Sequence, residues 1–255
     1  MIICLDIGNS TSTVGLFEEE KLLCLTTLPS SPLPSKEQWE SIFAALLEYK
    51  KKEKTEVSGV AYSSVVPSSE ENIKLACASY FGLEPFAVDV TKDLGIRVNV
   101  DRPEEVGADI LSDAVAGKTL FEKDTLIVDL GTASKIILLG ENGIFEGCTI
   151  GAGPGIAKKA LNLDTAALPE VEFSLPEKVL GKNTIDAINS ALLYGLAEEI
   201  KGLCNLIEKE YGKPCRRVLT GGYANIVKDL MEGFSFYPDL VLYGVKEIYL
   251  RNVKA

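Results

Sequence analysis

The fold is decided by the opening stretch Met1-Ile2-Ile3-Cys4-Leu5-Asp6-Ile7-Gly8-Asn9-Ser10-Thr11-Ser12-Thr13, because a near-copy returns at Leu126-Ile127-Val128-Asp129-Leu130-Gly131-Thr132-Ala133-Ser134. In both stretches an apolar run ends in Asp-Ile-Gly or Asp-Leu-Gly, small polar residues follow, and a second apolar run begins. This order predicts a strand, a tight turn and a second strand. Because it is written twice, the sequence favours two related halves over one undivided domain.

The repeated turn has the chemistry of a phosphate site. A glycine lets the turn approach a ligand without a Cβ in the way, and free backbone N–H groups beside short hydroxyls form an anion cradle. An aspartate at the strand end can hold the cation that accompanies the anion. Two such hairpins facing each other would grip a polyphosphate. The alternative is a pair of ordinary hairpins ending in Asx-type turns, which has no need to repeat the Asp-x-Gly order.

Composition excludes several classes of protein. The net charge of −11 over 255 residues argues against wrapping nucleic acid, which needs clustered basic residues. Asp6 stands close behind the initial Met with no basic leader, so the start does not read as a signal peptide. The longest apolar runs are broken by Asp129 and Lys135, so we expect no membrane span and a cytoplasmic protein.

The chain has six cysteines, no C-x-x-C pair and no histidine. Zinc sites and disulfide frameworks are therefore poor interpretations, and buried free thiols in a reducing compartment are the better one. The lack of histidine excludes every mechanism with an imidazole base. Acid–base work must fall to carboxylates, lysine, tyrosine or cysteine.

Strands that alternate with helices after an opening meander indicate an α/β fold. Beyond the two hairpins, strands are expected at 22–27, 57–66, 85–88, 144–150 and 215–219. Helices are expected at about 36–52, 68–81, from 104 onward, at 156–163, in a long stretch capped by Asn183-Thr184, and after 224.

Three further stretches are candidates for chemistry. Asp109 and Asp113 are four residues apart and share one helical face, although a carboxylate in a first turn also suits the helix dipole. The glycine-rich stretch 147–155 precedes a helix and could bind phosphate there, while close strand–helix packing explains it about as well. Gly221-Gly222, between a strand and a helix, would let a flat adenine ring lie against backbone.

A series of motifs, in this order, resembles that of type III pantothenate kinases, which belong to the acetate and sugar kinase/Hsp70/actin superfamily. The motifs are Asp6-Ile7-Gly8-Asn9-Ser10-Thr11, Ser63-Ser64-Val65-Val66-Pro67, Gly107-Ala108-Asp109, Asp129-Leu130-Gly131-Thr132-Ala133, Thr165-Ala166-Ala167-Leu168-Pro169, Asn183-Thr184 and Thr220-Gly221-Gly222. The resemblance implies two ribonuclease H-like (actin-like ATPase) halves, each a mixed sheet flanked by helices, with a nucleotide cleft between. We expect these halves at 1–117 and 118–255.

The resemblance also implies roles for particular residues. Asp109 would be the base that takes the proton from the pantothenate hydroxyl, with Gly107, Ala108, Ile110, Val100 and Thr184 on the pantothenate side. Asp6 would lie near Mg²⁺, and Asp129 would coordinate a monovalent cation, K⁺ or NH₄⁺. ATP and its phosphates would be bound by Asp6, Ile7, Gly8, Asn9, Ser10, Thr11, Ser12, Thr13, Gly131, Thr132, Gly221 and Gly222. The family would act as a homodimer with pantothenate at the subunit interface.

The departures from the family pattern concentrate on the acceptor side. Ile110 stands where the family has arginine, and Val100 where it has tyrosine. Ser134-Lys135 replaces two threonines, Ala152 a proline, and Ala191 a glycine. Isoleucine cannot hydrogen-bond a carboxylate. If binding needs the contact that the arginine would make with the pantothenate carboxylate, its loss would weaken pantothenate binding by about 1.5–3 kcal/mol.

Three functions stay open on the sequence. The first is a working pantothenate kinase, making 4'-phosphopantothenate at the first step of coenzyme A biosynthesis, with Arg97, Arg102 or Lys135 meeting the acceptor carboxylate. The second is a kinase of the same fold with a different small hydroxyl acceptor. The third is a weakly active nucleotide-binding subunit or regulator, paired in a heteromer with a complete paralogue. None of these involves nucleic acid or a membrane. We favour the first, because Asp6, Asp109, Asp129 and Thr132 are all kept.

Overall fold

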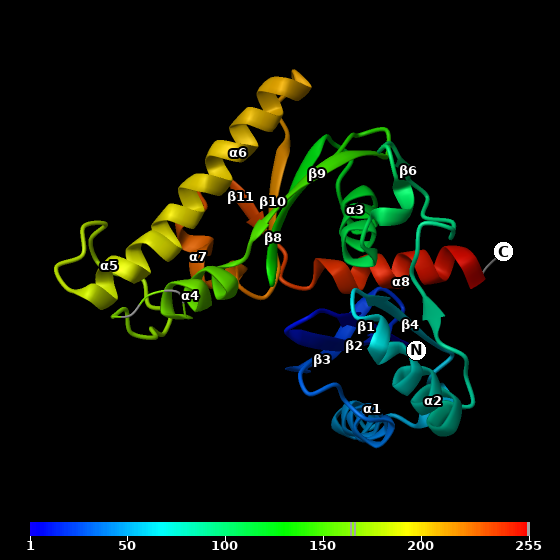
Figure 1. The fold of residues 1–255 in the computed structure, drawn as a ribbon. Helices are drawn as coiled ribbons and strands as arrows, with labels where there is room; N and C mark the ends of the chain where they lie inside the picture. The colour runs from blue at the N-terminus through cyan, green and yellow to red at the C-terminus, as the bar shows by residue number, and fades with distance from the viewer. Residues whose placement is uncertain (164, 166, 254–255) are drawn as a thin grey trace. The chain divides into compact units, whose positions relative to one another are not determined.

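The computed structural model describes residues 1–163, 165 and 167–253. Ala166, part of one family motif, therefore lies outside the described residues. The chain divides into two compact units, each with its own sheet and helices (Figure 1). Unit 1 is 1–97, 101–119 and 241–255, and unit 2 is 98–100 and 120–240. These units are defined by packing and not by the repeated hairpin, so the expected halves at 1–117 and 118–255 stay a prediction.

Unit 1 is built on a five-stranded sheet in the order β3-β2-β1-β4-β5. The first three strands form an antiparallel meander, and β4 and β5 then add in parallel beside β1. The strands are β1 (Ile2–Ile7), β2 (Thr11–Glu18), β3 (Lys21–Pro29), β4 (Gly59–Ser64) and β5 (Phe86–Ala87).

Unit 2 is built on a six-stranded sheet in the order β11-β10-β7-β8-β9-β6. Here β7, β8 and β9 form the meander, and β10 and β11 add in parallel beside β7. The strands are β6 (Arg97–Val98), β7 (Thr125–Leu130), β8 (Ala133–Leu139), β9 (Ile144–Ala152), β10 (Arg216–Thr220) and β11 (Phe234–Phe236). Apart from β6, this order repeats that of unit 1 strand for strand. The expectation of two ribonuclease H-like mixed sheets is confirmed.

The sheet of unit 1 is covered on both faces. Figure 1 shows α1 and α2 on one face and α3 and α8 on the other. On the first face Ile3, Leu5 and Ile7 of β1 join Trp39 and Phe43 in one buried cluster. These helices are α1 (Lys36–Lys50), α2 (Glu70–Phe81), α3 (Ala108–Leu120) and α8 (Leu240–Val253).

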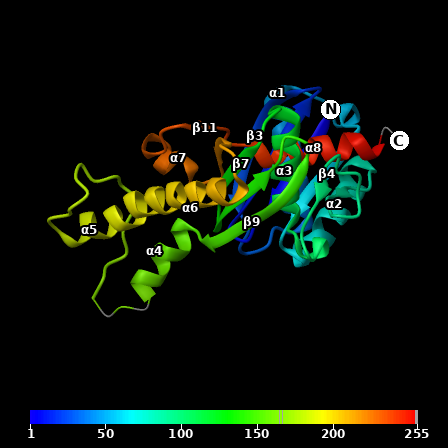
Figure 2. The ribbon, with the colours of Figure 1, turned by 90° about the horizontal axis from the view of Figure 1, so that it is seen from above.

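In unit 2 a long helical stretch packs against the sheet, with α4 and α5 toward one end of it (Figure 2). Leu126, Val128 and Leu130 of β7 form a buried cluster with residues of α6 such as Ile200. The helices are α4 (Pro154–Leu163), α5 (Thr184–Ser190), the π-helical segment η4 (Ala191–Gly195), α6 (Leu196–Tyr211) and α7 (Ala224–Val227). Thr184 to Tyr211 is thus one helical stretch with a π segment inside it.

Four elements differ from the sequence expectation. The helix expected from Glu104 begins at Ala108, because residues 103–105 form a separate 3₁₀ turn, η3 (Pro103–Glu105). The short strands β6 and β11 and the C-terminal α8 have no counterpart in the sequence prediction. No helix among the described residues is long and apolar enough to cross a membrane.

Candidate functional site

The first hairpin joins β1 to β2. Asp6 lies in register with Thr13 on β2 and with Ser63 on β4. The N–H of Gly8 donates to the carbonyl of Thr11 at 3.0 Å, which closes the turn and leaves Asn9 and Ser10 exposed at its tip. A turn of this kind presents short polar groups and backbone to a ligand, as the sequence predicts for a phosphate loop.

The end of β3 braces this hairpin. Ser12 is fully buried, and its hydroxyl lies 2.8 Å from that of Ser30. The N–H of Ser30 also donates to the carbonyl of Ser10 at 2.9 Å. Of the expected phosphate residues, Ser12 therefore holds the loop in place with its side chain.

Strand alternation fixes the direction in which Asp6 points. Since Ile3, Leu5 and Ile7 face α1 and α2, Asp6 faces the side of the sheet that α3 and α8 cover. Ser63, its parallel neighbour, is fully buried, and among the described residues its hydroxyl has no hydrogen-bond partner. A carboxylate beside an unsatisfied hydroxyl fits a hydrated Mg²⁺, which protein sites hold through one or two carboxylates plus substrate phosphates.

Asp109 lies in the first turn of α3, half-buried, with its Oδ1 accepting from the N–H of Ile110 at 2.8 Å. Gly107 makes this placement possible, because a Cβ at 107 would stand 2.5 Å from Asp109 Oδ1 and 3.7 Å from Val65. The two motifs around Val65 and Asp109 thus lie side by side.

Other residues in the first two turns of α3 are buried in the interior. Ile110 is 5% exposed and Asp113 is 1% exposed, so the shared face of Asp109 and Asp113 is mostly interior. Gly244 of α8 lies directly on Ser112, whose carbonyl oxygen would be 1.8 Å from a Cβ at 244. This contact fixes the helix that carries Asp109.

The second hairpin joins β7 to β8 and is one residue shorter than the first. Asp129 lies in register with Lys135 on β8, whereas Asp6 has Thr13 at that place. The N–H of Gly131 donates to the carbonyl of Ala133 at 3.1 Å, with Thr132 at the tip. Lys135 Nζ lies 2.5 Å from Asp129 Oδ2, and the two side chains are only 9% and 14% exposed.

Glycines pack tightly around this second hairpin. Gly221 has φ +93°, and a Cβ there would be 2.3 Å from Asp129 Oδ1. The N–H of Tyr223 donates to the carbonyl of Leu130 at 2.9 Å, which ties the Gly221-Gly222 turn to the hairpin. Among the residues that the structure describes, nothing lies within 4 Å of a Cβ built at Gly222. Unit 2 therefore brings together the residues expected to bind phosphate and those expected to border adenosine.

Sequence reasoning missed part of this cluster. The N–H of Gly153 donates to the carbonyl of Thr132 at 3.0 Å, and a Cβ at 153 would be 2.3 Å from that oxygen. Gly155, in the first turn of α4, leaves room for the Tyr223 hydroxyl, 2.4 Å from its missing Cβ. Close packing thus explains these two glycines. The glycine-rich stretch indicated close packing, but its partners Thr132 and Tyr223 are distant in sequence and could not be predicted.

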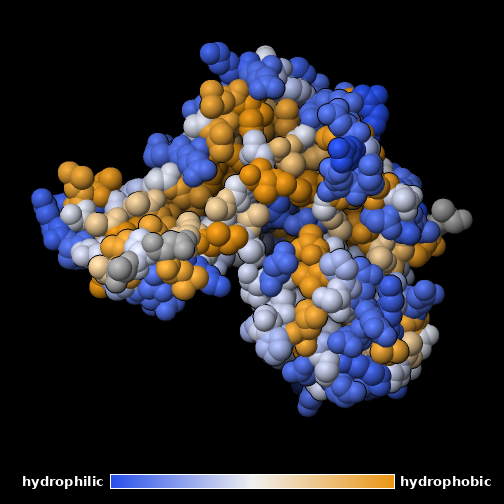
Figure 3. All heavy atoms as spheres, viewed as in Figure 1, coloured by the Kyte–Doolittle hydropathy of each residue, from blue (hydrophilic) through white to orange (hydrophobic). Residues whose placement is uncertain are grey.

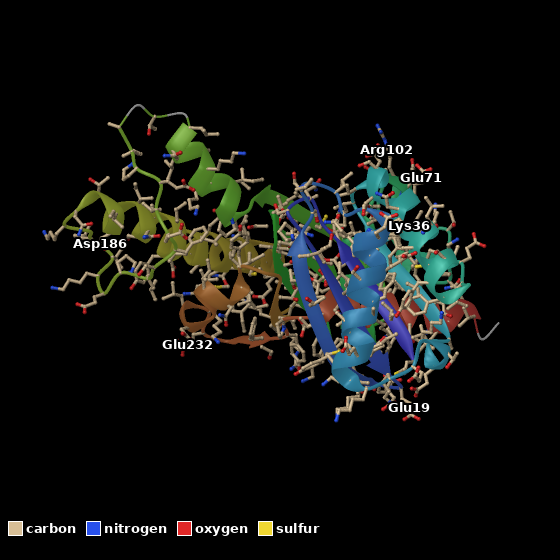
Figure 4. All side chains as sticks on the ribbon, turned by 90° about the horizontal axis from the view of Figure 1, so that it is seen from below. Glu19, Lys36, Glu71, Arg102, Asp186 and Glu232 are labelled. Carbon is tan, nitrogen blue, oxygen red and sulfur yellow. The ribbon has the colours of Figure 1, made fainter. Side chains whose placement is uncertain are left out.

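The α5 end carries the other acceptor-side residues. Asn183 caps α5, and its side-chain oxygen accepts from the N–H of Asp186 at 2.9 Å (Asp186 in Figure 4). Thr184 is exposed in the first turn of this helix. Asn183 and Thr184 line an open hollow of about 490 Å³, together with Leu161, Lys182, Ile188 and Ala191. Val100 is half-buried just after the edge strand β6.

The cations considered as replacements for the family arginine are unequally placed. Arg102 is exposed and pairs with Glu105 (Figure 4). Arg97 is exposed on β6. Lys135 is buried against Asp129. A monovalent metal ion at Asp129 does not fit these residues, because a lysine ammonium already contacts one carboxylate oxygen and Gly221 crowds the other.

The doubled sheet order and the two Asp-x-Gly hairpins give the chain the fold of actin-like ATPases and of acetate and sugar kinases. Among solved structures the chain is similar to component A of the (R)-2-hydroxyglutaryl-CoA dehydratase of Acidaminococcus fermentans. The TM-score is 0.60 at 14% identity, over 99% of this chain and 97% of that one. That likeness shows the fold alone.

Sequence comparison identifies the family. The family model for type III pantothenate kinase matches residues 2–206. A type III pantothenate kinase of Dehalococcoides mccartyi is 34% identical over 98% of both chains, and one of Agathobacter rectalis is 31% identical over 99% of this chain and 98% of its own. The chain belongs to the type III pantothenate kinase family.

Proposed function

We propose that this protein transfers the γ-phosphoryl group of ATP to the hydroxyl of pantothenate and yields 4'-phosphopantothenate, at the first step of coenzyme A biosynthesis. The observation that carries the proposal is a family match over most of the chain, joined to a carboxylate, Asp109, held at a helix start by a glycine that leaves room for it. A kinase of this family uses ATP with a divalent metal.

Asp109 is the base in this proposal. Phosphoryl transfer needs little covalent chemistry from the protein, so positioning and charge neutralisation dominate, with one carboxylate orienting the attacking hydroxyl. Asp109 has one oxygen engaged by the Ile110 N–H, which sets its rotation. The other oxygen then accepts the proton of the pantothenate hydroxyl. The absence of histidine from the chain agrees with a carboxylate in this role.

The hairpins bind phosphate. In unit 1 the exposed tip of the first hairpin offers backbone N–H groups and hydroxyls, and Asp6, beside Ser63, would hold the Mg²⁺ that accompanies ATP. In unit 2 Thr132 at the second tip contacts ATP, and Gly221 and Gly222 border the adenosine. Mg²⁺ bound with ATP would neutralise part of the negative charge on the phosphoryl group during its transfer. The expected nucleotide cleft between the halves stays a prediction.

The acceptor side of the proposal concerns Thr184, Ile110 and Val100. Thr184 is exposed beside an open hollow, which agrees with a contact to pantothenate. Ile110 is buried, and Val100 is half-buried. Their contacts with substrate, and those of Gly107 and Ala108, stay predictions. The residues around Asp129 do not fit the K⁺ or NH₄⁺ that the resemblance implies, so no step here uses one.

A homodimer is part of the proposal. Figure 3 shows apolar side chains gathered over the α4 and α5 region. Large apolar residues there are widely exposed, namely Ile156, Leu163, Val179, Leu180 and Ile185. Exposed apolar patches mark interaction sites, and a second copy is the partner that the family resemblance favours over a paralogue. The buried thiols of Cys4, Cys77 and Cys204 agree with a reducing cytoplasm.

Ile110 in place of an arginine favours one second candidate, a kinase with a less charged acceptor. ADP release with purified protein and Mg-ATP separates the two, when pantothenate is compared with hydroxy compounds that lack its carboxylate. We expect pantothenate to be turned over fastest. A faster neutral acceptor would replace pantothenate as the substrate, and no acceptor-dependent ADP release at all would favour the regulator.

A further inference from the structure

The second hairpin places a buried ammonium group where the first has a hydroxyl. Asp129 faces Lys135 across β7 and β8, and Asp6 faces Thr13 across β1 and β2. Resting on the proposed kinase activity, we propose that the Lys135 ammonium serves as a built-in monovalent cation at Asp129, so that turnover needs no K⁺ or NH₄⁺.

The geometry of the pair supports this. Lys135 Nζ lies 2.5 Å from Asp129 Oδ2, so the ammonium and the carboxylate are in direct contact. Both side chains are largely shielded from solvent, at 9% and 14% exposure. Pairs in such a place are screened little by salt. The contact is therefore a fixed part of the hairpin in solution.

The surroundings leave no place for a second cation on the carboxylate. A Cβ at Gly221 would stand 2.3 Å from Asp129 Oδ1, so the backbone of Gly221 packs beside that oxygen. A free cation at Oδ2 would meet the ammonium of Lys135 at close range, and like charges repel strongly where water is excluded. The carboxylate can hold one positive charge, and the chain itself supplies it.

The chemistry of the two ions is close. A lysine ammonium is a compact charge of +1 with three N–H donors, which makes it a tethered form of NH₄⁺. Unlike free NH₄⁺, the Lys135 ammonium is held by β8 opposite Asp129. Its presence at this place therefore does not depend on the concentration of ions in solution. It keeps the net charge beside the turn of Gly131 and Thr132 constant.

The wild-type protein gives the first test. ADP release with Mg-ATP and pantothenate is measured in tetramethylammonium chloride and then with K⁺ or NH₄⁺ added at constant ionic strength. We expect turnover to change less than about twofold, because the cation place is already filled. A rise of tenfold or more with K⁺ would overturn the inference. Turnover absent under every condition would instead defeat the proposed kinase function, so the two failures are distinguishable.

The variant Lys135→Thr gives the converse test. It removes the ammonium and restores the residue type of the family pattern, which leaves room and an extra oxygen at Asp129. We expect turnover in tetramethylammonium to fall at least tenfold and K⁺ to recover most of it. The matched control is Lys209→Thr, an exposed lysine of α6, which should respond to K⁺ as the wild type does.

Thermal unfolding gives a readout that does not depend on activity. Any ion that binds only the folded state raises the melting temperature with its concentration. K⁺ should therefore raise the melting temperature of Lys135→Thr over tetramethylammonium and leave the wild type and Lys209→Thr unchanged. If Lys135→Thr turns over equally well with and without K⁺, Lys135 is not the cation at this site. If the variant does not fold, the wild-type titration alone decides.

Discussion

At the scale of single residues, two glycines leave room for the carboxylates of the candidate site. Gly107 lies under Asp109, and Gly221 lies against Asp129. In both cases the missing Cβ would stand within 2.5 Å of a carboxylate oxygen. The glycines of the two motifs therefore set side-chain positions as well as backbone turns.

Gly107→Ala is expected to lower kcat by about 10- to 100-fold, the scale of a misplaced catalytic group. The added Cβ meets Asp109 Oδ1, the end of a side chain, so Asp109 rotates while the backbone stays. The melting temperature should change little. Steady-state kinetics and thermal unfolding check this. The control Gly202→Ala, in open space on α6, should keep kcat and gain up to about 1 kcal/mol of stability. An unchanged kcat in Gly107→Ala would remove the proposed positioning of Asp109.

Gly221→Ala and Gly222→Ala form a matched pair. At 221 an alanine is strained by φ +93° and collides with Leu130 backbone, so we expect a loss of about 1–3 kcal/mol in stability. At 222 the Cβ would meet nothing, so the fold should be kept and ATP affinity should fall if the adenosine lies there. Urea unfolding and binding of a fluorescent ATP analogue measure both effects. Equal stability losses in the two variants would contradict the packing argument.

At the scale of elements, α8 holds α3, the helix that carries Asp109, in place. Gly244 lies on Ser112, and Phe17 of β2 meets Tyr243 edge-on at 5.2 Å between ring centroids. Lys246, 2% exposed, pairs with Glu20 and adds a polar tie from α8 to the β2–β3 turn. The C-terminal helix is thus part of unit 1, although it comes last in the chain.

Gly244→Ala is expected to destabilise the protein by about 1–3 kcal/mol, the cost of overpacking a close contact. The added Cβ would meet the Ser112 carbonyl at 1.8 Å, which is backbone and can yield only by moving α3 away. Since Asp109 is on α3, kcat should also fall. Urea unfolding and kinetics test this, with Gly202→Ala again as the control. A variant with wild-type midpoint and kcat would mean that α8 does not fix α3.

A second element-scale prediction concerns pH. Arg217 of β10 binds Glu208 of α6 through two nitrogens, at 2.6 and 3.2 Å. The hydrogen bond to Arg217 lowers the pKa of the Glu208 carboxyl below its ordinary value of 4.5. A lowered pKa gives stability that is present above pH 4.5 and is lost as pH falls through the folded value. Arg217→Met should lower the unfolding free energy at pH 7 by about 1.5–3 kcal/mol and flatten its dependence on pH below 4.5. Urea unfolding at several pH values measures this, and an unchanged acid slope would contradict it.

The sequence predicted those helices and strands whose residue pattern lies within the element itself. Both hairpins, α1, α2 and the Asn183 cap follow from alternation, helical periodicity and capping. The start of α3 was placed too early, because the acidic run at 104–105 looks like a first turn but forms η3. The helix α8 was missed, because its apolar run is compatible with a strand and Gly244 weakens the helical signal.

The candidate site was predictable in its motifs and not in its contacts. Asp6, Asp109 and Asp129 stand in motifs that can be read directly. The Asp129–Lys135 pair depends on the register across β7 and β8, which is set by a turn one residue shorter than that of the first hairpin. Tyr223 and Gly155 meet only through the folding of distant segments.

At the scale of the whole molecule, one sheet order has been used twice with different chemistry at equivalent places. Asp6 in unit 1 has Ser63 and Thr13 beside it, a polar setting that suits a hydrated divalent ion. Asp129 in unit 2 is paired with Lys135, and the ammonium group of this lysine supplies a positive charge at that place. Family membership extends over nearly the whole length of the chain, so both units belong to the same proposed kinase.

The most direct test of the central claim is mass-spectrometric detection of 4'-phosphopantothenate formed from Mg-ATP and pantothenate by the wild type and by Asp109→Asn. The wild type should form the product. Asp109→Asn should bind an ATP analogue with nearly wild-type affinity and form product about 10²–10⁴-fold more slowly, the usual contribution of a general base. Wild-type turnover in Asp109→Asn, or no phosphopantothenate from the wild type, would contradict the account.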